Sequence, residues 1–321
     1  MKKFFVYLMA VVAMAVYSVS ASAQNTLVAT LTHGGEISMF YGVNALRNAH
    51  DAAQHGDVIN LSGGAFERID IKKAVSIRGA GANGDNPTSI KGDFSIEIPA
   101  EVTERFSLEG CRVLNKMYIR GTLTNAYFLK DSISIIDCIG ETKMINGKFV
   151  NCKVREMRHN KASKTLFVNC FVTSFSNEEG TVSNVSFVNC VIRESISSLH
   201  SCQFANSIIY GASWPCLPST SAAVNCVGIN SDNNMFKDLS SKTGCSIAKL
   251  DIFIDSNPEN DLTPEAKDTY LGTDGTPVGM YGGSLPFDWT PTYPQITKMN
   301  VASKTTADGK LSVEIEVSAA Q

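Results

Sequence analysis

The middle of the chain consists of short stretches in which apolar and polar residues alternate, and each stretch changes phase at an asparagine. One of them is Val185-Ser186-Phe187-Val188-Asn189-Cys190-Val191-Ile192. Alternation with a period of two is typical of a β-strand, and the shift at Asn189 indicates a bend at that residue. Asparagine tolerates the left-handed backbone conformation better than other non-glycine residues. We therefore predict a one-residue corner at Asn189, with Val185, Phe187, Cys190 and Ile192 pointing inward.

This unit recurs along the chain. Three copies share the tetrapeptide Phe-Val-Asn-Cys, at residues 149–152, 167–170 and 187–190, and residues 204–207 and 223–226 are degenerate copies. A repeat this short cannot bury its own apolar face, so it must stack on its neighbours. The corner asparagines are then expected to form a structural ladder, about 4.8 Å apart, with side-chain amides hydrogen-bonded from one to the next. Its members are Asn151, Asn169, Asn189, Asn206 and Asn225.

The spacing of these asparagines predicts the fold class. They are 18, 20, 17 and 19 residues apart, which is enough for three short strands and three bends in each turn. We expect an all-β protein, a right-handed single-stranded parallel β-helix (solenoid) with an N-terminal capping helix and a C-terminal β-hairpin extension. The main alternative is an antiparallel β-sandwich in which the repeats are coincidental. A leucine-rich horseshoe would need a Leu-x-x-Leu-x-Leu frame, which the chain lacks.

Three regions follow from this pattern. Residues 1–23 have the features of a secretory signal peptide, because Lys2-Lys3 precedes an apolar run and Ala21-Ser22-Ala23 is a cleavage site of small residues. Residues 24–254 are expected to form the β-helix, with a capping helix at about residues 43–55. Residues 255–321 are expected to form a closing segment and a hairpin that covers the open end of the solenoid, or that serves in sorting. We therefore expect an exported protein in the periplasm, at the cell surface or outside the cell, with no transmembrane segment after signal cleavage.

Segments near both ends of the chain carry a resemblance. Near the N-terminus, an alanine-rich helix is followed by Gly56-Asp57-Val58-Ile59-Asn60-Leu61 and then by Val75-Ser76-Ile77-Arg78-Gly79-Ala80-Gly81. Near the C-terminus, Asp274-Gly275 precedes Gly279-Met280-Tyr281-Gly282-Gly283. These segments resemble the pectate-lyase-like right-handed parallel β-helix superfamily, as found in uncharacterised secreted β-helix proteins of Gram-negative bacteria. The resemblance implies a helix that plugs the N-terminal end of the solenoid. It also suggests an enzymatic function, as a polysaccharide lyase or a glycoside hydrolase.

Charge and cysteine content narrow the possible partners. The formal charge is −3, with 28 Lys and Arg against 31 Asp and Glu, and no basic stripe with interleaved aromatic residues is present, so no nucleic-acid partner is expected. The cysteines number nine, and Cys152, Cys170 and Cys190 occupy the same inward position, which favours reduced core thiols over disulfides. With no Cys-x-x-Cys pair and scattered histidines, neither a metal site nor a cofactor is expected, and calcium enters only under the lyase alternative.

The chain lacks the active-site motifs of the enzymes that the resemblance raises. It has neither the Asn-Thr-Asp and Gly-His-Gly motifs of polygalacturonases nor the Arg-x-Pro-x-x-Arg motif of calcium-dependent pectate lyases. One set of titratable residues is a candidate catalytic cluster if its members share a face of the solenoid, although charges in such positions usually form a solvated surface. The set is Glu156, Arg158, His159, Glu194 and His200.

Sugar binding without catalysis requires exposed aromatic platforms. The candidates are Tyr210, Trp214, Trp289 and Tyr293, which the pattern places in bends or loops, with a packing role as loop anchors as the alternative. The function that we expect is that of an exported, non-catalytic surface or periplasmic β-helix protein. Its role would be structural or adhesive, with a polysaccharide or cell-surface glycan as partner. The alternative is a carbohydrate-active enzyme of the pectate-lyase-like fold.

Overall fold

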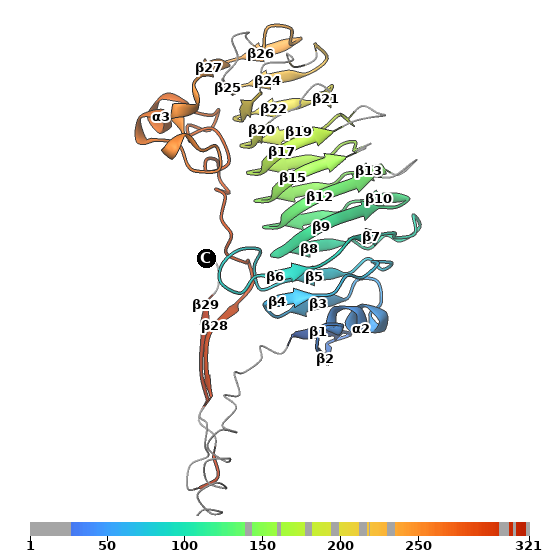
Figure 1. The fold of residues 1–321 in the computed structure, drawn as a ribbon. Helices are drawn as coiled ribbons and strands as arrows, with labels where there is room; N and C mark the ends of the chain where they lie inside the picture. Colours follow the sequence, from blue (N-terminus) through green and yellow to red (C-terminus); the bar gives the residue numbers. More distant parts are fainter. Residues whose placement is uncertain are drawn as a thin grey trace, which may run out of the picture.

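The structure is a computed structural model that describes residues 27–138, 143–158, 162–176, 182–193, 199–211, 217, 219–229, 235–301, 308–310 and 313–318. The chain winds into a parallel β-solenoid of about eight turns, with one strand of each long sheet contributed by each turn (Figure 1). Residues 1–23, predicted to be a signal peptide, lie outside the described residues. None of the described helices is long and apolar enough to cross a bilayer.

The first long sheet, sheet A, has twelve strands. It is parallel except at its N-terminal edge, where β1 pairs antiparallel with both β2 and β3. In spatial order its strands are β2 (Glu36–Tyr41), β1 (Val28–His33), β3 (Val58–Leu61), β5 (Ser76–Arg78), β8 (Ser107–Glu109), β11 (Tyr127–Leu129), β14 (Lys148–Val150), β16 (Leu166–Val168), β19 (Ser186–Val188), β22 (Gln203–Ala205), β24 (Ala222–Val224) and β26 (Ser241–Thr243).

The second long sheet, sheet B, is parallel throughout, and from β9 onward each of its strands follows a strand of sheet A across a tight corner. In spatial order its strands are β27 (Ser246–Ala248), β25 (Val227–Ile229), β23 (Ile208–Tyr210), β20 (Val191–Arg193), β17 (Phe171–Ser176), β15 (Lys153–Arg158), β12 (Ser132–Cys138), β9 (Cys111–Ile119), β6 (Thr88–Ile90) and β4 (Gly64–Phe66), with β7 (Phe94–Ile96) also paired to β9.

The third face of the solenoid is made of short pairs. β10 (Thr122–Thr124) pairs with β13 (Lys143–Ile145), and β18 (Val182–Ser183) pairs with β21 (Leu199–His200). Ser163 bridges both Ile145 and Ser183, so the two pairs belong to one column.

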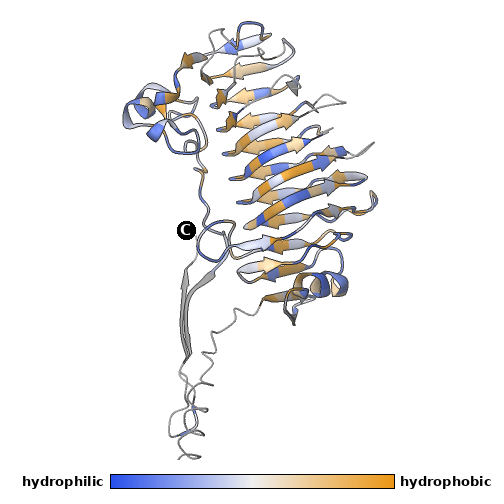
Figure 2. Cartoon of the chain, in the orientation of Figure 1, coloured by the Kyte–Doolittle hydropathy of each residue, from blue (hydrophilic) through white to orange (hydrophobic). Residues whose placement is uncertain are grey.

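Stacks of aromatic side chains fill the interior. Successive ring centroids of the sheet A phenylalanines lie 4.5, 4.6, 5.0 and 5.2 Å apart, and all of the rings are buried. They belong to Phe128, Phe149, Phe167, Phe187 and Phe204. The residues that the sequence pattern points inward around Asn189 are fully buried as well. Figure 2 shows the alternation of hydrophobic and hydrophilic residues along the strands that produces this core.

Helix α2 (Ala45–Ala52) lies at the N-terminal end of the stack, within the range predicted for a helix (Figure 1). It packs against β1, β2 and β3 through Ala45, Leu46, Ala49 and His50, which are buried. These buried positions are spaced at the helical period, so one face of a short helix meets the first coils.

After the last coil the chain turns back along the outside of the solenoid. It passes through two short 3₁₀ turns, η1 (Leu250–Ile252) and η2 (Ile254–Ser256), and through α3 (Pro264–Thr269). Apolar residues of this region, among them Phe253, Leu262 and Met280, bury the outer face of sheet B at Phe171, Val191 and Ile208. We call residues 250–289 the C-terminal unit.

The predicted terminal hairpin is formed by β28 (Gln295–Val301) and β29 (Val313–Ser318), which pair antiparallel. It lies toward the N-terminal end of the solenoid and away from β26 and β27 (Figure 1). We expected this hairpin to cover the C-terminal end of the solenoid, where the last coil lies. For the described residues that expectation is wrong. The reason is that residues 271–293 first run back along the solenoid and carry the hairpin with them.

Candidate binding groove and the C-terminal strap

A groove lies on the outer face of sheet B, where strands β9, β12, β15 and β17 run side by side. Arg112, Ser132, Lys153 and Phe171 stand in register on these four strands, so their side chains form one outward column. The next outward positions are Leu114, Ser134, Arg155 and Thr173. Together with Glu259 from the C-terminal unit, these residues line a cavity of about 340 Å³.

Lys153 joins the groove to the C-terminal unit. Its ammonium nitrogen lies 3.2 Å from the carboxylate of Glu259. It also lies 5.6 to 5.9 Å from the ring centroids of Phe171, Phe287 and Trp289, which is within the range of cation–π attraction. Phe287 and Trp289 pack edge to face with centroids 4.9 Å apart. Lys153 therefore connects the groove to an aromatic cluster, of which Phe171 also lines the groove.

The other cations of the groove are positioned differently. The Arg112 guanidinium donates a hydrogen bond of 3.0 Å to the carbonyl of Ala82, which fixes its direction along the sheet. Arg155 is exposed on β15. The lining thus presents three cations, one carboxylate and the hydroxyls of Ser132, Ser134 and Thr173. Such a surface attracts anions, and guanidinium groups match the planar geometry of a carboxylate or sulfate.

A second feature lies beside the groove, at the corner where each sheet A strand turns into sheet B. One residue in each of these turns has a positive φ there. From Gly110 to Asn225 its backbone N–H donates to the carbonyl that ends the next sheet A strand. We call this set the corner column. Its members are Gly110, Lys130, Asn151, Asn169, Asn189, Asn206, Asn225 and Gly244.

Five side chains of the corner column bind a segment that we call the C-terminal strap, residues 271–293: those of Lys130, Asn151, Asn169, Asn206 and Asn225. The amide nitrogen of Asn169 donates to the carbonyls of Met280 and Gly282 at 2.8 and 2.6 Å. Asn206 accepts from the N–H of Thr273 at 2.9 Å. Asn225 donates to Leu271 and Asn151 to Pro286. The ladder of amides expected from the sequence is therefore replaced here by amide-to-strap bonds, because backbone groups of the strap lie within hydrogen-bond distance of these side chains.

One amide-to-amide bond does form, at a different corner. The side-chain nitrogen of Asn146 donates to the side-chain oxygen of Asn125 at 3.3 Å, and both residues have positive φ. This corner precedes the strands of sheet A, where the strap does not run. Stacked asparagines thus bond to each other where no other partner reaches them.

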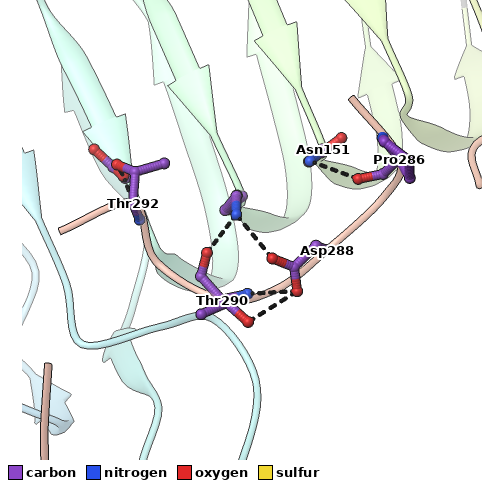
Figure 3. A network of polar contacts seen from close by, with 7 residues as sticks. Asn151, Pro286, Asp288, Thr290 and Thr292 are labelled. Atoms are coloured by element: carbon purple, nitrogen blue, oxygen red, sulfur yellow. Dashed lines mark hydrogen bonds and ion pairs between the residues drawn. The ribbon is translucent and has the colours of Figure 1, made fainter. Parts of the chain in front are cut away.

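The C-terminal part of the strap, residues 288–292, is held by an ion pair and further hydrogen bonds (Figure 3). The ammonium group of Lys130 lies 3.1 Å from a carboxylate oxygen of Asp288 and also donates to the carbonyl of Thr290. Partial burial raises the pKa of Asp288, but hydrogen bonds from Thr290 and Lys130 outweigh it and hold that pKa below its usual value. Thr292 then hydrogen-bonds to Glu109. Each turn from Glu109 to Asn151 therefore holds its own residue of the strap.

Just inside the corner column, the next residue of each turn points into the core. The side chains of this set, which we call the thiol column, belong to Cys111, Asp131, Cys152, Cys170, Cys190, Ser207, Cys226 and Cys245. The cysteines are free thiols, and burial raises the pKa of Cys111, Cys152 and Cys170 well above the usual value. At the last coil Cys245 is only partly buried, and hydrogen bonding with Cys226 lowers its pKa to about 6.

Asp131 is the one carboxyl group in this column. It is fully buried and accepts a hydrogen bond of 2.8 Å from the N–H of Cys111, while its second oxygen has no hydrogen-bond partner among the described residues. Burial raises the pKa of Asp131 well above the usual value. A neutral acid fits a core position that is otherwise filled by thiols and a hydroxyl.

Of the five residues predicted to form a catalytic cluster, the structure describes Glu156, Arg158 and His200. Glu156 and Arg158 lie on β15 of sheet B and make a two-bond ion pair with distances of 2.7 and 2.8 Å. His200 lies on β21 of the third face, so it does not share a sheet with them. His159 and Glu194 lie outside the described residues. No group of three or more His, Cys, Asp or Glu within the described part of the chain is placed to hold a metal ion.

The predicted aromatic platforms have different surroundings. Trp289 is half-buried beside Lys153 at the groove. Tyr210 is half-buried on sheet B with Arg193 over its ring at 5.8 Å. Tyr293 ends the strap, where its hydroxyl donates to the carbonyl of Gly79 and burial raises its pKa. Trp214 lies outside the described residues.

Sequence reasoning did not single out Arg112, Lys153 or Arg155 as a group. They are separated by up to 43 residues, and only the register of β9, β12 and β15 brings them together. A signal exists in hindsight, because Arg112 and Lys153 each lie two residues after a corner residue, Gly110 and Asn151.

Comparison with known proteins does not assign the chain to a family. No family model matches it, and no curated protein or solved structure is similar to it at a significant level.

Proposed function

We propose that this is an exported, non-catalytic protein of the periplasm or cell surface, with a structural or adhesive role, that binds an acidic glycan. In this proposal the solenoid is right-handed, as parallel strand connections nearly always are. Helix α2 caps its N-terminal end, and the C-terminal unit closes its outer face. The observation that carries the proposal is the sheet B groove, whose lining includes three cations, Arg112, Lys153 and Arg155, and one carboxylate, Glu259.

The lining of this groove suits a charged sugar chain. A polysaccharide needs hydroxyl partners, an apolar surface for the sugar ring and, if it is acidic, cations at intervals. Ser132, Ser134 and Thr173 provide hydroxyls, while Trp289 and Phe171 flank Lys153. Arg112 and Lys153 stand two strand spacings apart, about 9–10 Å, with Ser132 between them, so the two cations can meet separate acidic groups along an extended polymer.

The test uses the mature chain, residues 24–321, with polygalacturonate and a sulfated polysaccharide as acidic probes and dextran as the neutral probe. We expect the acidic probes to bind, with an affinity that falls as salt is raised. Arg155→Ala should weaken binding about tenfold or more, because a hydrogen bond to a charged group contributes about 1.5–3 kcal/mol. Trp289→Ala should weaken it as well.

The matched control is Lys148→Ala. Lys148 belongs to the same coil but lies on sheet A, so the substitution removes an equal charge away from the groove. The proposal is overturned if the acidic probes bind no better than dextran, or if Lys148→Ala and Arg155→Ala weaken binding equally. Release of unsaturated or reducing-end products from any of these polysaccharides would support the enzymatic alternative in its place.

A further inference from the structure

The two edges of sheet A differ in how they are protected. β26, at the C-terminal edge, is three residues long and carries Lys242 at its centre. The ammonium group of Lys242 donates to the carbonyls of Phe236 and Lys237 at 3.1 and 3.3 Å. A short strand and a central lysine are two of the devices by which proteins prevent edge-to-edge association.

β2, at the N-terminal edge, has neither device. It is six residues long and contains no lysine or proline, and among the described strands it pairs on one side only, with β1. Ile37, Met39 and Tyr41 alternate along it and are 69%, 54% and 59% exposed, so they form an apolar stripe on the outer face. The opposite face of β2 meets helix α2 and the core through Phe40. An unprotected, exposed and apolar edge is typical of an interaction surface.

The sequence of β2 is self-complementary. If two copies pair antiparallel about a two-fold axis at Met39, then Ile37 faces Tyr41 of the partner subunit, and Met39 faces Met39 of the partner subunit. Glu36 faces Gly42 of the partner subunit, so no like charges meet. The same operation at β26 would place Lys242 opposite its own copy. Charge therefore permits pairing of identical chains at one edge and opposes it at the other.

From these observations we infer that the mature protein forms a two-fold dimer in which the β2 strands of two copies pair antiparallel. The two A sheets then make one continuous sheet, and the stripes of Ile37, Met39 and Tyr41 from both copies form one apolar surface. Ile37, Met39 and Tyr41 do not line the sheet B groove, so the dimer inference does not depend on the glycan proposal. In a surface protein, such a dimer would present two grooves to one polymer.

The first experiment is sedimentation velocity on residues 24–321. We expect a dimer at micromolar concentration, and Met39→Lys should weaken it at least about tenfold because two lysines then meet on the axis. Ile247→Lys is the matched control, since Ile247 is 40% exposed on β27 at the other end of the solenoid. Circular dichroism spectra of both variants should match that of the unmodified chain.

The second experiment is independent of affinity. Met39→Cys should give a dimer linked by a disulfide under mild oxidation, whereas Ile247→Cys should not, because only the β2 pairing brings identical positions together. A monomer at 100 µM, which would follow if the β28–β29 hairpin of the same chain covered β2, overturns the inference. A dimer that Met39→Lys leaves intact also overturns the inference. The same holds if Ile247→Lys disrupts the association as much as Met39→Lys does, which is the result that head-to-tail stacking of the solenoids would give.

Discussion

The inner and outer sides of the corner column are built on different principles. On the inner side most turns repeat their neighbours, with phenylalanine over phenylalanine from Phe128 to Phe204 and a column made mainly of thiols. On the outer side each turn meets a different residue of the strap, from Leu271 at Asn225 to Thr292 at Glu109. The inner contacts thus stabilise neighbouring turns against each other, whereas the outer ones bind together turns that are far apart.

This difference predicts how the two sides respond to substitution. In a solenoid, stability is approximately a sum of the turns and the interfaces between neighbours. Loss of an inner contact therefore weakens two interfaces at once. Loss of an outer contact weakens one attachment of a strap that has several others.

The largest effect is expected for Phe167→Ala. The ring of Phe167 is fully buried and stacks on Phe149 at 4.6 Å and on Phe187 at 5.0 Å. Removing it should lower the free energy of unfolding by about 3–5 kcal/mol, because lost burial and an unfilled cavity add together. Urea denaturation followed by circular dichroism measures the change. A loss below about 1 kcal/mol would contradict the view that the inner stack holds the turns together.

An intermediate effect is expected at Asn169, where the two sides meet. Asn169→Ala removes the bonds to Met280 and Gly282 and also places alanine at φ 50°, so we expect a loss of about 2–3 kcal/mol. Asn169→Gly removes the same bonds but accepts the left-handed backbone, so its loss should be about 1 kcal/mol. The same denaturation experiment measures the loss in free energy of unfolding for both variants. The difference between the two losses gives the contribution of the corner's backbone conformation, because both variants lack the bonds to the strap. Equal losses would mean that the backbone conformation contributes nothing.

The smallest effect is expected for Asp131→Asn, and it depends on pH. The pKa of Asp131 is raised in the folded protein, so folding takes up a proton, and stability falls as the pH rises above the ordinary aspartate value of 3.8. Asparagine does not ionise and can still accept from Cys111. At pH 7 the variant should be about 1 kcal/mol more stable than the unmodified chain, and the gap should shrink toward pH 4. Thermal unfolding at several pH values measures it, and a destabilised variant at pH 7 would contradict the assignment of a neutral buried acid.

The part of the fold that the sequence predicts is the part that repeats. The phase shift at Asn189 predicts both a positive φ, observed at 51°, and an inward Val185, Phe187, Cys190 and Ile192. These properties are local, since they follow from the alternation of side chains along a strand and from the tolerance of asparagine for one backbone conformation. Stacking follows as well, because a single turn cannot bury its own apolar face.

The sequence by itself therefore determined the solenoid, its corner residues and its core. Tertiary structure alone decided what the outer surfaces meet. The corner amides bond to the strap, Lys130 pairs with Asp288 158 residues away, and Arg112 joins Lys153 and Arg155 in one groove. No period in the chain relates these partners, because the strap does not repeat, and its path back along the solenoid depends on how the C-terminal unit packs on sheet B.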